Sequence, residues 1–144
     1  MLLTEKILIA ALMMFLCTLV HALFMGAATN ALEWRFKRFG PPRGPFDRIL
    51  QVWLMILWMI ISVMIEVWLW GVLYQYDMAI TELPDPQSAF DFSLVTYTTH
   101  GYGDIVLTGE WRTLSAVQAG NGVKIFGRTT AFIFYFIQQI YKKH

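Results

Sequence analysis

The stretch YTTHGYGD occupies residues 97–104, and the rest of the chain is read outward from it. Gly101 and Gly103 flank Tyr102. Because glycine adopts positive φ angles without strain, this spacing lets the backbone turn successive carbonyl groups toward one side, which ordinary L-residues resist. Long apolar segments lie on both sides of the stretch. A plain glycine-rich turn in a membrane protein is the alternative interpretation.

The composition is that of a membrane protein without catalytic machinery. Apolar residues make up 57% of the chain and charged residues 15%, with a formal net charge of +1, so bulk charge favours no partner. The sequence has no phosphate-binding loop, no His/Cys cluster with metal spacing and no evident nucleophile–base pair. The single cysteine, Cys17, excludes an internal disulfide. We therefore expect neither an enzyme nor a cofactor, and no binding of nucleic acid.

Residues 1–48 are expected to form an N-terminal membrane span and a basic loop. The apolar run over residues 7–28 would be roughly 33 Å long as a helix, enough to cross a bilayer. A cleaved signal peptide is the competing interpretation, but Glu5 beside Lys6 leaves no net positive charge before the run, which is also too long. His21 lies inside the span, and we expect it to form hydrogen bonds between helices.

The basic loop follows this first segment. Gly40 and the two prolines after it should end the helix near Arg38. Aromatic residues alternate with cations here, a composition typical of an interfacial segment facing anionic lipid headgroups on the cytoplasmic side of a membrane. The cations are Arg35, Lys37, Arg38, Arg43 and Arg48.

Residues 49–144 contain two further long segments and a short one. An outer helix over about 49–76 precedes an acidic stretch that includes Asp77. Asp85 and Pro86 are suited to begin a short helix over about 87–98, half a membrane thick, which a glycine-rich return would make re-entrant. An inner helix over about 111–140 ends at Lys142 and Lys143. This charge asymmetry places the N-terminus outside and the C-terminus in the cytoplasm.

Three charged residues lie within the expected spans. A carboxylate at the depth of Glu66 is costly, so it should face protein and have a partner. Lys124 and Arg128 lie four residues apart, on one face of the inner helix at a comparable depth. We expect Glu66 to pair with one of these cations, within or between subunits; the alternative is that the cations reach lipid headgroups.

Residues 49–140 resemble the two-helix pore module of potassium channels, and the whole chain resembles small bacterial ion-channel proteins with one extra N-terminal span. The resemblance is strongest in the T-x-G-Y-G-D signature and the helix before it. The matching segments are EVWLW at 66–70, FSLVTYTT at 92–99, GYGDI at 101–105, Asn121-Gly122, Phe126-Gly127 and Thr130-Ala131.

The resemblance implies an all-α integral protein of the bacterial plasma membrane, in which four copies of three spans, a re-entrant pore helix and a selectivity-filter loop (residues 99–104) form a potassium-selective pore. Backbone carbonyl groups would replace the hydration shell of K⁺. It assigns ion binding to Thr99, His100, Gly101, Tyr102 and Gly103, the filter mouth to Asp104, an inner-helix hinge to Gly122, and the cavity lining to Val123, Phe126, Thr130, Phe134 and Gln138. Lys124 and Arg128 fall off the cavity face.

The sequence departs from the family pattern at His100, where the family usually has Val, Ile or Leu. Its side chain is expected to pack behind the filter and to make conduction pH-dependent between about pH 5 and 8. A non-selective cation channel and a non-conducting or regulatory membrane subunit therefore remain alternatives. The first helix is expected to pack outside the second.

Overall fold

The computed structural model describes residues 3–42, 44–76 and 80–141 of the chain. All regular secondary structure in these residues is helical: α1 (Leu3–Phe39), α2 (Pro45–Tyr76), α3 (Pro86–Tyr97) and α4 (Gly109–Tyr141). Arg43, Asp77 and residues 142–144, which carry part of the charge pattern described above, lie outside the described residues.

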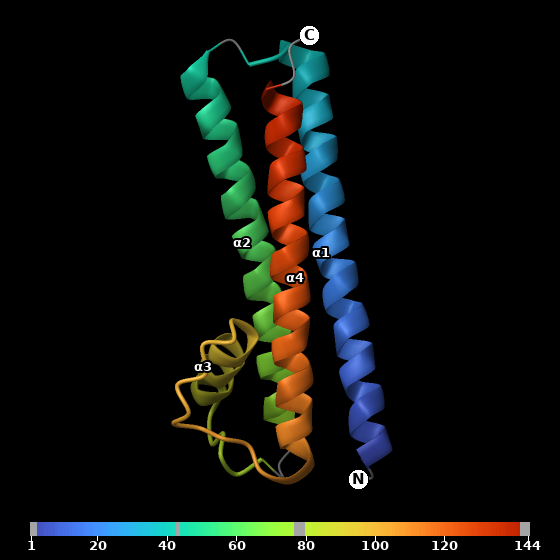
Figure 1. The fold of residues 1–144 in the computed structure, drawn as a ribbon, viewed down its shortest axis with the longest axis vertical. Coiled ribbons are helices and arrows are strands. Elements are labelled where there is room, and N and C mark those ends of the chain that lie inside the picture. The colour runs from blue at the N-terminus through green and yellow to red at the C-terminus, as the bar shows by residue number, and fades with distance from the viewer. Residues whose placement is uncertain (1–2, 43, 77–79, 142–144) are drawn as a thin grey trace.

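The three long helices run side by side, and the short helix α3 lies at one end of them (Figure 1). α3 packs against α2 and α4. α1 begins at the end of the bundle where α3 lies, whereas the connection from α1 to α2 lies at the other end, beside the last turn of α4 (Figure 1). The glycine-rich segment and the basic loop are therefore at opposite ends of the molecule.

Local sequence signals account for the helix boundaries. α1 ends at Phe39 because Gly40 takes a φ of +78° and its N–H returns to the carbonyl of Phe36 at 2.9 Å, and prolines follow. At the start of α3, Asp85 accepts hydrogen bonds from the backbone N–H of Ser88 (2.9 Å) and from its hydroxyl (2.8 Å). The expected capping by Asp85, with a proline in the first turn, is thus what the structure contains.

α1 packs against α2, as expected, and it also packs against α4, which the sequence did not predict. On the α4 side, the ammonium group of Lys6 lies 3.1 Å from the centre of the Trp111 ring. On the α2 side, the indole N–H of Trp58 donates to the carbonyl of Phe24 at 3.0 Å. α4 carries polar groups that lipid could not hydrogen-bond, and α1 covers them.

Two apolar clusters hold the helices together. One lies at the α3 end of the bundle, where Trp70 and Tyr74 of α2 meet Tyr97 of α3 and Leu114 and Ile125 of α4, all almost completely buried. The other lies toward the basic end and consists of Ala28, Leu32, Met55, Met59, Phe132, Phe136 and Ile140. Along α1 and α2, the buried polar residues His21, Ser62 and Glu66 lie between the two clusters.

Two of the described helices, α1 and α2, are long and apolar enough to cross a membrane. α4 has 33 residues, about 50 Å at ~1.5 Å per residue, but Lys124, Arg128 and several amide side chains lower its hydropathy. The prediction that α4 is a third span therefore depends on how those groups are covered.

Gly122 allows a close approach between α3 and α4. A Cβ built on it would lie 1.9 Å from the carbonyl oxygen of Tyr97 and 2.9 Å from its carbonyl carbon. α4 runs unbroken through this position. The structure thus gives Gly122 a packing role against the last residue of α3, and its assignment as a hinge stays a prediction.

Gly122→Ala should separate α3 from α4, because the contacted atoms are backbone and cannot rotate away. Overpacking of this kind costs about 1–3 kcal/mol or more, so the unfolding temperature of the purified protein in detergent should fall by several degrees. Gly120→Ala is the matched control, since nothing lies within 4 Å of a Cβ there. Equal unfolding temperatures for the two variants would contradict the close contact.

Candidate filter and its supporting network

The segment that follows α3 has an unusual backbone. Positive φ angles recur at every second residue: +58° at Thr99, +52° at Gly101 and +80° at Gly103. Glycine takes such angles readily, but a β-branched threonine does so only under strain, and strain of this kind is concentrated at functional sites. The whole of residues 98–104 is exposed on the single chain.

The start of this segment is fastened to the end of α3 by backbone hydrogen bonds. The N–H of His100 donates to the carbonyl of Val95 at 2.9 Å, and the N–H of Gly101 donates to the same carbonyl at 3.3 Å. The N–H of Thr99 donates to the carbonyl of Thr96 at 3.0 Å. A displacement of the last turn of α3 therefore moves the predicted ion-binding residues with it.

His100 does not pack into the protein behind the segment, as the sequence had led us to expect. Its side chain is exposed, and its ring meets the ring of Tyr102 edge to face with centroids 4.6 Å apart. The reason is that residues two apart on an extended segment project to the same side, and Tyr102 itself is 71% exposed. In the single chain, both rings lie on a surface that no other element covers.

A buried amide joins α2, α3 and α4 behind the segment. Gln118 accepts a hydrogen bond from the hydroxyl of Tyr74 at 2.8 Å and donates to the hydroxyl of Ser93 at 2.7 Å. The Ser93 hydroxyl in turn donates to the carbonyl of Val67 at 2.7 Å. Sequence reasoning missed this cluster. Its only signal was a serine and a glutamine in otherwise apolar helices, which does not reveal the direction in which they point.

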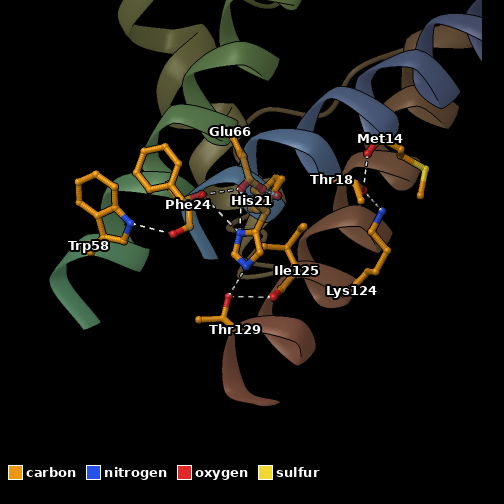
Figure 2. Close-up of polar contacts among 11 residues, drawn as sticks. Met14, Thr18, His21, Phe24, Trp58, Glu66, Lys124, Ile125 and Thr129 are labelled. Carbon is orange, nitrogen blue, oxygen red and sulfur yellow. Dashed lines mark hydrogen bonds and ion pairs between the residues drawn. The ribbon is translucent and has the colours of Figure 1, made fainter. Parts of the chain in front are cut away.

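Glu66 is fully buried, and each of its two carboxyl oxygens has at least one hydrogen-bond partner. Oε1 lies 3.0 Å from Nδ1 of His21 in α1 and accepts from the hydroxyl of Ser62 at 3.1 Å, and Oε2 accepts from the hydroxyl of Tyr97. Nε2 of His21 lies 3.1 Å from the hydroxyl of Thr129 in α4 (Figure 2). The predicted hydrogen bonding of His21 between helices is confirmed.

The pairing of Glu66 with Lys124 or Arg128 was wrong for the single chain, because the cations face α1. The ammonium group of Lys124 donates to the hydroxyl of Thr18 at 2.8 Å, and this hydroxyl donates to the carbonyl of Met14 (Figure 2). Arg128 is half-buried and lines a hollow together with Met25 of α1. α1 thus covers the charged face of α4.

The residues assigned to the cavity lie on another face of α4. All five are exposed on the single chain and follow one another at helical spacing, whereas Gly122 is buried against α3. The exposed stripe carries no charged side chain. Its members are Val123, Phe126, Thr130, Phe134 and Gln138.

Carboxylates surround the outer end of the segment. Glu82 accepts hydrogen bonds from the hydroxyl of Thr108 at 2.7 Å and from its backbone N–H at 3.2 Å, and these bonds lower the pKa of Glu82. The N–H of Ser88 lowers the pKa of Asp85 in the same way. Asp104 is exposed at the end of the segment. This end of the molecule therefore stays negative at neutral pH.

A family model described as an ion channel matches residues 58–139. The chain belongs to this ion channel family. The matched region runs from the middle of α2 through α3 and the glycine-rich segment to the end of α4, so it contains Glu66, Tyr97 and Gly122 but not α1. No curated protein and no solved structure matches the chain.

Membership of the ion channel family establishes the class of activity. The channel transports ions and is not an enzyme, as the composition had predicted. Among the residues that the structure describes, no group of three or more His, Cys, Asp or Glu side chains could hold a metal ion.

Asp85→Ala should destabilise the channel at neutral pH and much less in acid. Because the pKa of Asp85 is lowered in the folded state, its contribution is complete above its ordinary pKa of 3.8 and is lost as the pH falls below that value. Unfolding temperatures of both proteins should be compared at pH 7 and pH 3. Asp91→Ala, an exposed carboxylate in the same helix, is the control. A difference in unfolding temperature between Asp85→Ala and the wild type that is as large at pH 3 as at pH 7 would contradict the capping role of the Asp85 carboxylate.

Proposed function

We propose that the protein is a potassium-selective channel in which four copies of the chain surround one pore. Residues 99–103 form the selectivity filter, and backbone oxygens take the place of the water around K⁺. Asp104 lies at the outer mouth. The exposed stripe of α4 lines the way from the filter to the cytoplasm, and Gly122 is the hinge of this helix.

The alternation of φ along the filter carries this proposal. In an ordinary extended chain, successive carbonyl groups point to opposite sides. Positive φ at Thr99, Gly101 and Gly103 breaks that alternation and allows successive carbonyls to share one side. The rings of His100 and Tyr102 share a side as well. This is the arrangement that a row of carbonyl ligands along an axis requires.

The position of α3 supports a cation in the pore. α3 has 12 residues and ends directly before the filter. The carbonyl end of a helix carries a partial negative charge, which favours a cation placed near it. At the other side of the filter the carboxylates of Glu82, Asp85 and Asp104 raise the local concentration of cations.

The need for several copies follows from the exposed surface of one chain. A single chain supplies one filter segment, and that segment and the α4 stripe are both uncovered. Assembly of four copies about an axis would cover both surfaces at once. The charged face of α4 is already covered by α1, so neither Lys124 nor Arg128 would place a cation in the pore. Native mass spectrometry should give a mass near four times 16.7 kDa.

The charge distribution supports an orientation in the membrane. The α1–α2 connection, which follows Lys37 and Arg38 in the last turn of α1, lies beside the end of α4 and opposite the acidic filter end (Figure 1). Basic loops remain in the cytoplasm. We therefore place the N-terminus outside and the C-terminus in the cytoplasm, with α4 as the third span. The membrane is a bacterial plasma membrane, and its anionic headgroups contact the basic loop.

Purified protein in liposomes should conduct K⁺ far better than Na⁺. Gly103→Ala should abolish this selectivity, since Ala in a left-handed conformation costs about 1–2 kcal/mol, whereas Gly120→Ala in the open face of α4 should conduct as the wild type does. Ion flux measured with K⁺ or Na⁺ as the only permeant cation tests both. The absence of any flux over a range of voltage and pH would instead favour a non-conducting subunit.

A non-selective cation channel is the second candidate, favoured by the exposed ring of His100 in the filter. On this account K⁺ and Na⁺ fluxes would be similar in the wild type, and His100→Val would raise the ratio of K⁺ to Na⁺ flux. Ion flux through the wild type and through His100→Val, measured between pH 5 and 8, shows whether His100 makes conduction pH-dependent. A flux that is flat across this range, and unchanged in His100→Val, removes His100 from the account.

A further inference from the structure

We propose that His21, Glu66 and Tyr97 are positioning residues through which α1 fixes the end of α3 and, with it, the filter. The inference rests on the proposed function, because it gives a role in conduction to a helix outside the family's matched region. His21 lies in α1, which the ion channel family model does not cover, whereas Glu66 and Tyr97 both lie inside residues 58–139.

Tyr97 is held from two sides. It is the last residue of α3 and is fully buried. Its hydroxyl donates a hydrogen bond to Oε2 of Glu66. Its carbonyl oxygen packs so closely against Gly122 that a Cβ atom at that position would lie only 1.9 Å away. One anchor therefore comes from a side chain of α2 and the other from the backbone of α4. Because both anchors act on one residue, the end of α3 has a defined position.

The anchored residue lies directly before the filter. Only Thr98 separates Tyr97 from Thr99, whose φ of +58° is strained. The hydrogen bonds from His100 and Gly101 to the carbonyl of Val95 tie the filter to the same turn of α3. A strained backbone persists only where its surroundings hold it. The anchoring of Tyr97 supplies that hold on the protein side of the filter.

Hydrogen-bond accounting shows why α1 is required. The hydroxyl of Thr129 gives its one hydrogen to the carbonyl of Ile125 at 2.9 Å, so it accepts from Nε2 of His21. Glu66 already accepts from Ser62 and Tyr97. Nδ1 of His21, 3.0 Å from Oε1, therefore makes the third polar contact of this carboxyl group.

His21 is the partner that α1 provides for the buried carboxyl group of Glu66. Without His21, Glu66 would be a charged or unpaired group buried among α2, α3 and α4, and removal of one partner from a buried pair is strongly destabilising. The other ionisable groups nearby are Cys17, which is buried, and Lys124, which Thr18 holds. α1 thus completes the hydrogen bonding of the carboxylate that anchors Tyr97.

Two variants test this inference in the full-length protein. Tyr97→Phe removes only the anchoring hydroxyl and keeps the buried ring, and Tyr76→Phe is the matched control because Tyr76 is 84% exposed. The first readout is hydrogen–deuterium exchange of residues 98–104 in K⁺, which needs no conduction. We expect exchange to quicken roughly threefold to tenfold in Tyr97→Phe, as for the loss of one hydrogen bond, and not in Tyr76→Phe.

The role of α1 is tested by a pair of substitutions at His21. His21→Leu should quicken exchange at the filter as Tyr97→Phe does, and His21→Gln, which keeps a donor for Glu66, should restore slow exchange at least in part. In liposomes the same order should hold for the ratio of K⁺ to Na⁺ flux. Unaltered exchange at residues 98–104 in Tyr97→Phe and His21→Leu would overturn the inference.

The two proposals fail in different ways. A wild-type protein that does not select K⁺ contradicts the proposed function, while the exchange experiment still decides whether α1 positions the filter segment. A wild type that selects K⁺, with variants that match it in both exchange and flux ratio, contradicts only the positioning role. If His21→Leu does not assemble, Tyr97→Phe alone decides the anchoring by Glu66.

Discussion

The buried carboxylate of Glu66 is the constraint on which the arrangement of the helices depends. A carboxylate within a membrane span costs about 2.5–3.5 kcal/mol even on the insertion scale, and it is stable only where donors reach both oxygens. In this chain the donors come from α1 (His21), α2 itself (Ser62) and α3 (Tyr97). Three helices must therefore meet at one depth. The contact of His21 with Thr129 adds α4 to the same point.

The same constraint resolves the apparent conflict between a charged α4 and a cation pore. In the proposed channel, α4 presents one face to α3, one to α1 and one to the ion pathway. Gly122 allows the first contact, and Thr18 and its neighbours on α1 receive Lys124 on the second. The third face, from Val123 to Gln138, is left uncharged and uncovered.

Much of the fold could be predicted because its signals are local. Proline and glycine after Phe39, the aspartate cap before α3 and the glycines of the filter act on neighbouring residues, so a single sequence reveals them. The requirement that Glu66 face protein was also predictable, since it follows from depth alone. Membership of an ion channel family agrees with the filter signature, while the individual filter and cavity roles remain proposals.

The identity of the partners could not be predicted, because sequence gives the depth of a residue in a span but not the direction in which it points. Lys124 and Arg128 have the depth to meet Glu66, yet both point toward α1. His21 was expected to bond between helices, but nothing in its surroundings identified Glu66. Gln118 and Ser93 stood out only as polar residues in otherwise apolar helices. In each case the missing information was the rotation of one helix against another.

In the proposed channel, the exposed filter and the uncharged stripe of α4 meet those of three other copies of the chain around a potassium pathway. The most direct measurement is a cryo-electron microscopy structure of the full-length protein in lipid nanodiscs with K⁺. The account predicts four chains, ion density on the axis beside the carbonyls of residues 99–102, and α1 joined to Glu66 through His21. A different number of chains, or filter segments that face lipid away from the axis, would contradict it.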